Sequence, residues 1–316
     1  MNSQAALLAS LIGAVEAGQT AALCIVLATR GSTPQSPGAM LLLHGDGRME
    51  GTIGGGCVEA EVRKRALAML AERRSGTTEF KLNHDYGWDD GLICGGQMDV
   101  AVVPVFEAGA LGPFREAVAR LAGQYAADLP IRLEHEGRPV EYRLHLEATP
   151  TLLIAGAGHV GAELARLALG LDYRTVVIDD RADLLSPERL PPPIEGLTGD
   201  IAEVLRGWPI DANTYVVIVT RGHRHDEQAL HAVVDSPARY LGMIGSRRKI
   251  RVIFDDLAEL GVDRDRLERV HSPIGLAIGA ITVPEIAVSI AAELTQVRRE
   301  RGAKPVTGPF EISASS

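Results

Sequence analysis

Cysteine is scarce in this chain, which has only three thiols in 316 residues: Cys24, Cys57 and Cys94. A small secreted domain stabilised by disulfides needs more, so the sequence excludes a disulfide framework. The scarcity also favours a reducing compartment, and we expect a cytoplasmic protein. The first residues lack the basic segment and the cleavage pattern of a signal peptide, which agrees with that expectation.

An excess of positive charge and a long uncharged apolar run are also absent. The formal net charge is −9, whereas proteins that bind duplex nucleic acid usually present a basic face, so we expect no nucleic-acid partner. A membrane-spanning helix needs about 20 consecutive apolar residues. The nearest approach, 276–294, is interrupted by Pro284 and Glu285, so we expect no membrane span.

The chain has enough length and apolar content for two domains, with 46% hydrophobic residues. Its patterns predict an N-terminal domain at 1–110, a connecting helix and hairpin at 111–149, a second domain at 150–302 and a loose tail at 303–316. A homodimer is a further expectation, because the apolar strands of the N-terminal domain need an outer partner.

The order of strand and helix patterns predicts the fold class. Strand patterns at 21–30, 39–44 and 97–106 and a helix pattern at 57–74 indicate an α+β N-terminal domain. Beyond residue 150, strands alternate with helices, which is typical of a parallel sheet. We therefore predict an α/β protein, with a C-terminal Rossmann-like doubly wound parallel sheet and a smaller N-terminal α+β domain. The C-terminal strands are expected at 151–156, 175–180, 194–199, 215–220 and 238–245.

The segment GAGHVG follows a predicted strand and opens a predicted helix. In such a turn the first glycine permits the tight turn, the second lets a pyrophosphate approach and the third lets helix and strand pack closely. Gly156, Gly158 and Gly161 occupy these positions, with His159 at the helix start. Asp179 ends the next strand, where it could accept hydrogen bonds from a ribose hydroxyl. The pattern predicts a Rossmann domain and leaves open whether NAD(P) is bound.

A second polar segment, TRGHRHD, follows the fourth strand of the predicted parallel sheet. Ligands bind at this edge of such sheets, so Arg221, His223 and Asp226 are candidate binding residues. Imidazole and carboxylate also suit zinc or iron, although His-x-His-Asp is a weak metal signature. In the alternative interpretation, Asp226 caps a helix and the histidines are polar loop residues.

A third segment, GSRRK, follows the fifth strand and opens another helix. Gly245 and Ser246 supply a turn and a hydroxyl, and Arg247 and Lys249 lie among three cations at the helix start. This combination predicts a phosphate site, while a solvated basic helix face remains the alternative.

The N-terminal part contains an unusual glycine run in GTIGGGCVE. Gly54, Gly55 and Gly56 precede a predicted helix and can present free N–H groups to a ligand. Cys57 is expected on the first turn, where the amino end of a helix lowers the pKa of a thiol. Glu59 could transfer protons, or it could be a carboxylate that is favourable at a helix start.

The other two cysteines lie in different contexts. Cys94 is in the glycine-flanked segment ICGG, so Cys57 and Cys94 could bind a soft metal centre or carry sulfur. Cys24 lies within a strand pattern and is interpreted as a small buried hydrophobic residue.

Taken together, these motifs resemble the XdhC/CoxI family of molybdenum-hydroxylase maturation factors. The order and spacing of the matching segments are more specific than any one of them, and Val283 departs from the proline expected at that helix start. The matching segments are RGSTPQSPGAM, GTIGGGCVE and ICGG in the N-terminal half, and GAGHVG, TRGHRHDEQAL, YLGMIGSRRK and HSPIGLAIGAITVPEIAVSIAAEL in the C-terminal half.

The resemblance implies a chaperone of the molybdenum cofactor (molybdopterin) rather than a turnover enzyme. Family members are thought to bind the cofactor, support its sulfuration and insert it into a xanthine dehydrogenase-like or CO dehydrogenase-like apoenzyme. The implied partners are that apo molybdenum hydroxylase and a cysteine desulfurase. Cys57 would then approach molybdenum or relay sulfur, while 156–161 and 247–249 would hold the phosphate of the pterin.

Two other interpretations stay open at this point. GAGHVG with Asp179 is also compatible with an NAD(P)-dependent oxidoreductase, in which His223 or His159 would be the acid or base. The histidines of the TRGHRHD segment are compatible with a zinc- or iron-dependent hydrolase.

Overall fold

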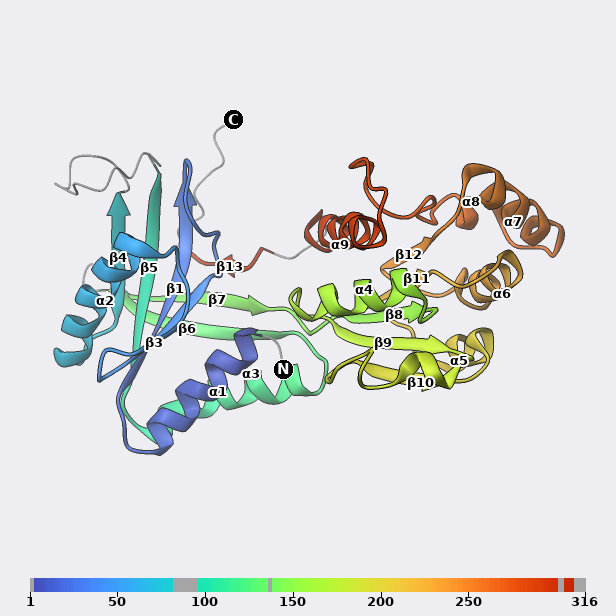
Figure 1. Cartoon of the computed structure of the whole chain (residues 1–316). Coiled ribbons are helices and arrows are strands. Elements are labelled where there is room, and N and C mark those ends of the chain that lie inside the picture. Colours follow the sequence, from blue (N-terminus) through green and yellow to red (C-terminus); the bar gives the residue numbers. More distant parts are fainter. Residues whose placement is uncertain (1–2, 82–95, 136–137, 301–303, 310–316) are drawn as a thin grey trace. The chain divides into compact units, whose positions relative to one another are not determined.

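The computed structural model describes residues 3–81, 96–135, 138–300 and 304–309. The chain divides into two compact units (Figure 1). One unit comprises 1–148 together with 303–316, and the other comprises 149–302. In the described residues, no helix combines the length and apolar character needed to cross a membrane.

An antiparallel five-stranded sheet lies at the centre of the first unit, in the order β3-β2-β1-β5-β4. The strand patterns in the sequence predicted three of these strands and missed the two edge strands, β3 and β4. The strands are β1 (Ala21–Arg30), β2 (Met40–His44), β3 (Met49–Gly51), β4 (Gly76–Lys81) and β5 (Gln97–Val105).

Both faces of this sheet are covered within the first unit. In β1, Leu23 and Ile25 pack with α1 (Ser3–Glu16) and α3 (Gly112–Ala122), whereas Cys24 and Val26 pack with α2 (Gly56–Ala71). Successive side chains of a strand point to opposite faces, so an uninterrupted apolar strand needs two covers. The unit supplies both covers itself, which removes the reason for which a dimer was expected.

Cys24 is fully buried in this core. Burial raises the pKa of its thiol to about 12. The interpretation of Cys24 as a small buried hydrophobic residue is therefore confirmed.

The region predicted to connect two domains is part of the first unit. Its helix, α3, contributes buried Phe114 and Leu121 to the core, and it is followed by the hairpin of β6 (Ala127–His135) and β7 (Arg138–Leu146). The short strand β13 (Val306–Thr307) pairs antiparallel with β7. Within the stretch expected to be a loose tail, main-chain pairing therefore attaches residues 305–307 to the hairpin.

The second unit contains a parallel five-stranded sheet in the order β10-β9-β8-β11-β12. This confirms the predicted Rossmann-like topology, with each strand within a few residues of its expected place. The strands are β8 (Thr151–Ala155), β9 (Arg174–Asp179), β10 (Glu195–Thr198), β11 (Thr214–Ile218) and β12 (Tyr240–Met243).

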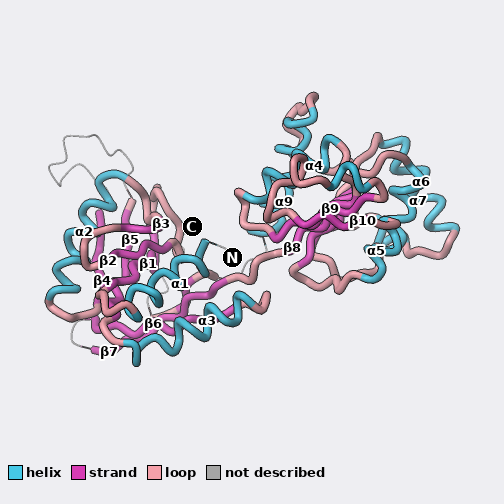
Figure 2. Tube along the Cα trace, turned by 60° about the horizontal axis from the view of Figure 1, so that its bottom comes forward, coloured by secondary structure: helices cyan, strands magenta, loops and turns pink. Residues whose placement is uncertain are grey.

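Helices cover both faces of the parallel sheet (Figure 2). On one face, α4 (His159–Leu169) and α9 (Val283–Glu300) share a hydrophobic core with the strands. The other face is covered by α5 (Ile201–Gly207), α6 (His223–Val233) and α7 (Arg247–Glu259), and the short α8 (Arg264–Leu267) follows. The sheet is therefore doubly wound, as predicted.

The strand order places the topological switch point at β8. The chain passes from β8 to β9 and β10 on one side, then returns to β11 on the other side. In open parallel sheets, ligands bind beyond the carboxyl ends of the strands at this point. The GAGHVG segment follows β8 and the TRGHRHD segment follows β11, so both lie there.

Candidate functional site

In the glycine turn after β8, two of the three glycines are required by close packing and the third faces open space. Gly156 has a φ of +116°, and a Cβ on it would lie 2.6 Å from the carbonyl oxygen of Val219. A Cβ on Gly161 would lie 1.9 Å from the carbonyl oxygen of Gly156. A Cβ on Gly158 would meet nothing within 4 Å. Of the three glycines, Gly158 is therefore the one beside which a ligand could approach the backbone, next to the exposed His159.

Asp179 holds the glycine turn rather than facing a ligand. Its side chain is 1% exposed, and its Oδ2 accepts a hydrogen bond of 2.7 Å from the N–H of Ala157. Arg181 donates to both carboxylate oxygens, from Nε to Oδ1 at 2.9 Å and from Nη2 to Oδ2 at 3.0 Å. The predicted ribose contact is therefore not available in this geometry, because both oxygens already have donors.

These contacts determine the protonation of Asp179. Although burial raises the pKa of this carboxyl, the hydrogen bonds from Arg181 and from the Ala157 N–H lower it to about 2. The pKa of an aspartate in the unfolded chain is near 3.9, so this shift contributes about 2 kcal/mol to the free energy of unfolding of the protein. Because the folded-state pKa is the lower one, this contribution is complete above about pH 4 and is lost as the pH falls through about 2.

We therefore expect Asp179→Asn to lower the free energy of unfolding by about 2 kcal/mol at pH 7. The difference from wild type should shrink as the pH falls below about 4. Urea unfolding of both proteins between pH 7 and pH 2.5 measures this difference in the free energy of unfolding. Asp235→Asn is the control, because it makes the same charge change at a carboxylate that is 73% exposed. A difference that stays constant down to the lowest pH would contradict the assignment.

Asp226 connects the second and third polar segments. It is fully buried, and its Oδ1 accepts hydrogen bonds from the Thr220 hydroxyl at 2.6 Å and from the Thr220 N–H at 3.2 Å. Its Oδ2 forms an ion pair with Lys249 Nζ. The alternative in which Asp226 caps the helix is wrong, because α6 begins at His223 with Gly222 as its N-cap. Asp226 instead fixes the loop after β11 to the start of α7.

The start of α7 presents two arginines to solvent. Ser246 is its N-cap and accepts a hydrogen bond of 3.3 Å from the Lys249 N–H, while Gly245 packs against the Lys249 side chain. Lys249 forms an ion pair with Asp226, so the predicted phosphate site depends on Arg247 and Arg248. Both are exposed, and neither forms an ion pair among the described residues.

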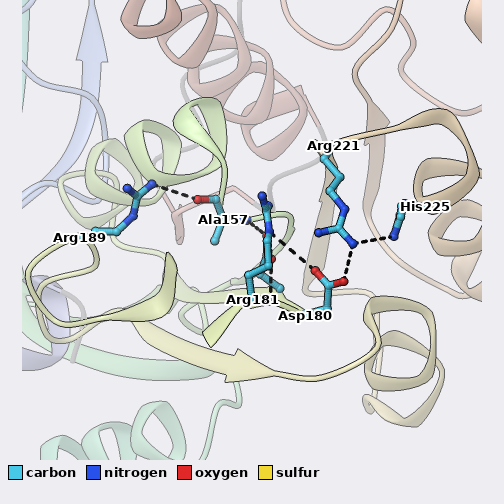
Figure 3. A network of polar contacts seen from close by, with 7 residues as sticks. Ala157, Asp180, Arg181, Arg189, Arg221 and His225 are labelled. Carbon is cyan, nitrogen blue, oxygen red and sulfur yellow. Dashed lines mark hydrogen bonds and ion pairs between the residues drawn. The ribbon is translucent and has the colours of Figure 1, made fainter. Parts of the chain in front are cut away.

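Arg221 lies between two partners (Figure 3). Its Nη2 donates to Asp180 Oδ2 at 2.7 Å and lies 3.3 Å from His225 Nε2. His223 is the exposed first residue of α6. Asp180 and Arg181 were not singled out from the sequence, although the acidic pair at the end of the second strand was a usable signal. His225 was considered from the sequence only as a possible metal ligand, and here it contacts Arg221.

The three segments predicted from the sequence meet at one edge of the sheet. Gly156 packs against Val219 and Thr220, Asp226 pairs with Lys249, and α4, α6 and α7 all begin there. Three helix N-termini and several guanidinium groups favour an anionic ligand. Across the described ranges, no group of three His, Cys, Asp or Glu side chains could hold a metal ion.

A second group of predicted residues lies in the first unit, at the start of α2. Gly54, Gly55 and Gly56 all have positive φ, at 143°, 70° and 55°, which non-glycine residues rarely adopt. Glu59 Oε1 accepts hydrogen bonds from the Thr52 hydroxyl at 2.6 Å and from the Gly55 N–H at 3.1 Å. These contacts agree with the interpretation of Glu59 as a helix-start carboxylate.

Three N-terminal segments come together beside this glycine run. A Cβ on Gly54 would lie 2.6 Å from Pro34, and a Cβ on Gly96 would lie 2.1 Å from the carbonyl oxygen of Ser32. Segments 30–40 and 51–59 and the end of the ICGG segment therefore lie at the same end of the sheet. Cys57 is the second residue of α2, and Cys94 lies outside the described residues.

Comparison with known proteins gives matches in both units. The family described as "XdhC Rossmann domain" matches residues 152–294, and the family described as "XdhC and CoxI family" matches residues 14–81. The uncharacterized protein YqeB of Escherichia coli is 30% identical over 88% of this chain. This chain spans only 43% of the length of YqeB.

Two other relatives match over most of their own length. A probable subunit of xanthine dehydrogenase from Bacillus subtilis is 24% identical and covers 90% of this chain and 95% of its own. The molybdenum cofactor insertion chaperone PaoD of Escherichia coli is 25% identical and covers 91% of this chain and 86% of its own.

A solved structure shares the fold. The crystal structure of a Bacillus halodurans protein described as a xanthine dehydrogenase superposes with a TM-score of 0.82 at 23% identity, covering 96% of this chain and 97% of that one. The matches in both units, in the order in which the sequence motifs occur, identify the family. The chain belongs to the XdhC and CoxI family.

Proposed function

We propose that this chain is a maturation factor that binds the molybdenum cofactor as its cargo. It delivers the cofactor to an apo molybdenum hydroxylase of the xanthine dehydrogenase or CO dehydrogenase type. Before delivery it supports sulfuration of the cofactor, with a cysteine desulfurase as the sulfur donor. In this role it is a chaperone and not a turnover enzyme.

The observation that carries this proposal is the convergence of anion-binding groups at the switch point of the second unit. The helices α4, α6 and α7 begin there, and the guanidinium groups of Arg221, Arg247 and Arg248 are at least partly exposed. Molybdopterin has a terminal phosphate, and helix N-termini together with arginines are the groups that bind phosphate best. The relative PaoD, which is named for molybdenum cofactor insertion, supports this choice of anion.

The NAD(P)-dependent oxidoreductase is the weaker alternative. A dinucleotide-binding Rossmann domain uses an acidic residue after its second strand to hold the adenosine ribose. Asp179 occupies that place, but both of its oxygens accept hydrogen bonds from Ala157 and Arg181. The zinc- or iron-dependent hydrolase is also disfavoured, since His225 contacts Arg221 and Asp226 contacts Lys249.

Co-elution with the cofactor tests the proposed function. Full-length protein is incubated with molybdenum cofactor released from a molybdoenzyme and then passed through a gel-filtration column. We expect molybdenum and pterin fluorescence to elute with the protein, and the eluted complex to activate an apo-hydroxylase.

Matched variants make this test specific to the second unit. Arg221→Gln combined with Arg247→Gln should lower the amount of bound cofactor by about tenfold or more, because two charge-assisted contacts are lost. Arg266→Gln, at an exposed residue paired with Asp235, should leave it unchanged. Elution of the wild-type protein without molybdenum, or dinucleotide binding with turnover, would refute the proposed function.

A further inference from the structure

Asp180 and Arg221 form a contact that crosses the carboxyl end of β8. Asp180 follows β9 and Arg221 follows β11, and both of these strands pair with β8 on its two sides. The hydrogen bond from Arg221 Nη2 to Asp180 Oδ2 is 2.7 Å long. The Asp180 carboxylate is therefore bound to the Arg221 guanidinium at the switch point, where a ligand anion would bind.

A second contact keeps Arg221 in place without Asp180. His225 Nε2 lies 3.3 Å from the same Nη2, and Figure 3 shows the guanidinium between His225 and Asp180. A guanidinium group can only donate hydrogen bonds, so His225 is the acceptor. When the carboxylate leaves, Arg221 is still oriented from the side of α6.

Asp180 also has a second cation within reach. Its Oδ1 lies 3.8 Å from Arg181 Nε, and Arg181 is fixed by its contacts with Asp179. The side chains of Arg221 and Asp180 are 44% and 36% exposed, which makes their ion pair one of the weak, solvent-screened kind. An incoming anion can therefore replace the carboxylate at Arg221, while Asp180 remains beside Arg181.

We propose that Asp180 is an internal competitor that sets an affinity threshold at Arg221. Any anion that binds Arg221 has to displace this carboxylate and then lie beside its negative charge. An anion that contacts only Arg221 binds too weakly to displace the carboxylate efficiently, whereas a ligand with further contacts at the same edge of the sheet has enough affinity to displace it. The inference rests on the proposed function only in taking Arg221 as a contact of the ligand phosphate.

Titration with inorganic phosphate tests the inference on the full chain by isothermal calorimetry. Asp180→Asn removes the competitor and the repulsion, so we expect phosphate to bind about tenfold more tightly than to wild type. The gain should vanish when Arg221→Gln is added, so that the double variant binds phosphate no better than Arg221→Gln alone. Asp235→Asn, which changes the net charge equally at a remote exposed site, should change the affinity less than about twofold.

Three outcomes would overturn the inference. They are equal affinity of Asp180→Asn and wild type for phosphate, a gain that persists without Arg221, and no phosphate binding by either protein. The assay contains no molybdenum cofactor, so its result is independent of the co-elution experiment. If the phosphate affinity of Asp180→Asn rises tenfold but molybdenum does not co-elute, this inference stands and the proposed function is refuted. If molybdenum co-elutes but the phosphate affinity does not rise, the proposed function stands and this inference is refuted.

Discussion

Replacing Gly161 by alanine should lower the stability of the second unit by about 3 kcal/mol or more. The new Cβ would lie 1.9 Å from the carbonyl oxygen of Gly156 and 3.3 Å from Cγ2 of Ile154. The first of these is a backbone atom of the turn itself, so α4 has to move away from β8. Such a movement loosens the core that α4 shares with α9. Thermal unfolding monitored by circular dichroism measures the loss, and limited proteolysis identifies the unit that opens.

Gly158→Ala is the matched control, because it makes the same chemical change three residues away. Its Cβ meets nothing within 4 Å, and Gly158 is the N-cap of α4 with a negative φ of −64°. We expect this variant to lose less than about 1 kcal/mol of stability. It should nevertheless weaken cofactor binding by about tenfold, or about 1.4 kcal/mol, if the ligand approaches the backbone at this glycine. Equal instability of the two variants would contradict the division of roles within the turn.

The Rossmann half was predictable because local and global signals agree in it. The strands β8, β11 and β12 are short and largely buried apolar runs, and each is followed by a turn and an amphipathic helix. The glycine turn adds a signal whose physical cause is visible in the structure. Gly156 and Gly161 are required by close backbone contacts, so the fold alone explains these two glycines and no ligand is needed to account for them.

The N-terminal half was less predictable because its organisation depends on pairing between distant segments. The hairpin β6–β7 has the local pattern of an independent ribbon, but its apolar face packs on α3 and the five-stranded sheet. The pairing of β13 with β7 joins residues more than 150 positions apart in the sequence. Register and partner choice of this kind are not encoded in any single window of sequence.

The candidate site was predictable at the level of segments but not of individual contacts. GAGHVG, TRGHRHD and GSRRK meet at one sheet edge, as parallel-sheet topology requires. Asp179 and Asp180 are adjacent and chemically identical, yet one is buried against Ala157 and the other reaches Arg221. Successive residues at a strand end point to opposite sides, so residue type alone could not assign these roles.

Cys57→Ala should abolish delivery of active, sulfurated cofactor to the apo-hydroxylase. Cys57 is the second residue of α2, directly after three glycines with positive φ. The amino end of a helix favours the thiolate, which is the form that binds metals and attacks sulfur. We expect the activity of the recipient enzyme to fall to the level measured without the chaperone. The measurement is activation of apo-hydroxylase in the presence of a cysteine desulfurase and a sulfur source.

Cys24→Ala is the control, because it removes a thiol that cannot take part in this chemistry. Burial raises the pKa of Cys24 to about 12, so the group stays protonated and inaccessible, and delivery should persist. The phosphate affinity of Cys57→Ala should equal that of wild type, since the anion-binding groups lie in the other unit. If the variant loses both phosphate binding and cofactor delivery, the loss indicates misfolding rather than a role of Cys57 in sulfur chemistry. Full activation of the apoenzyme by Cys57→Ala would exclude this thiol from sulfur transfer and from an essential contact with molybdenum.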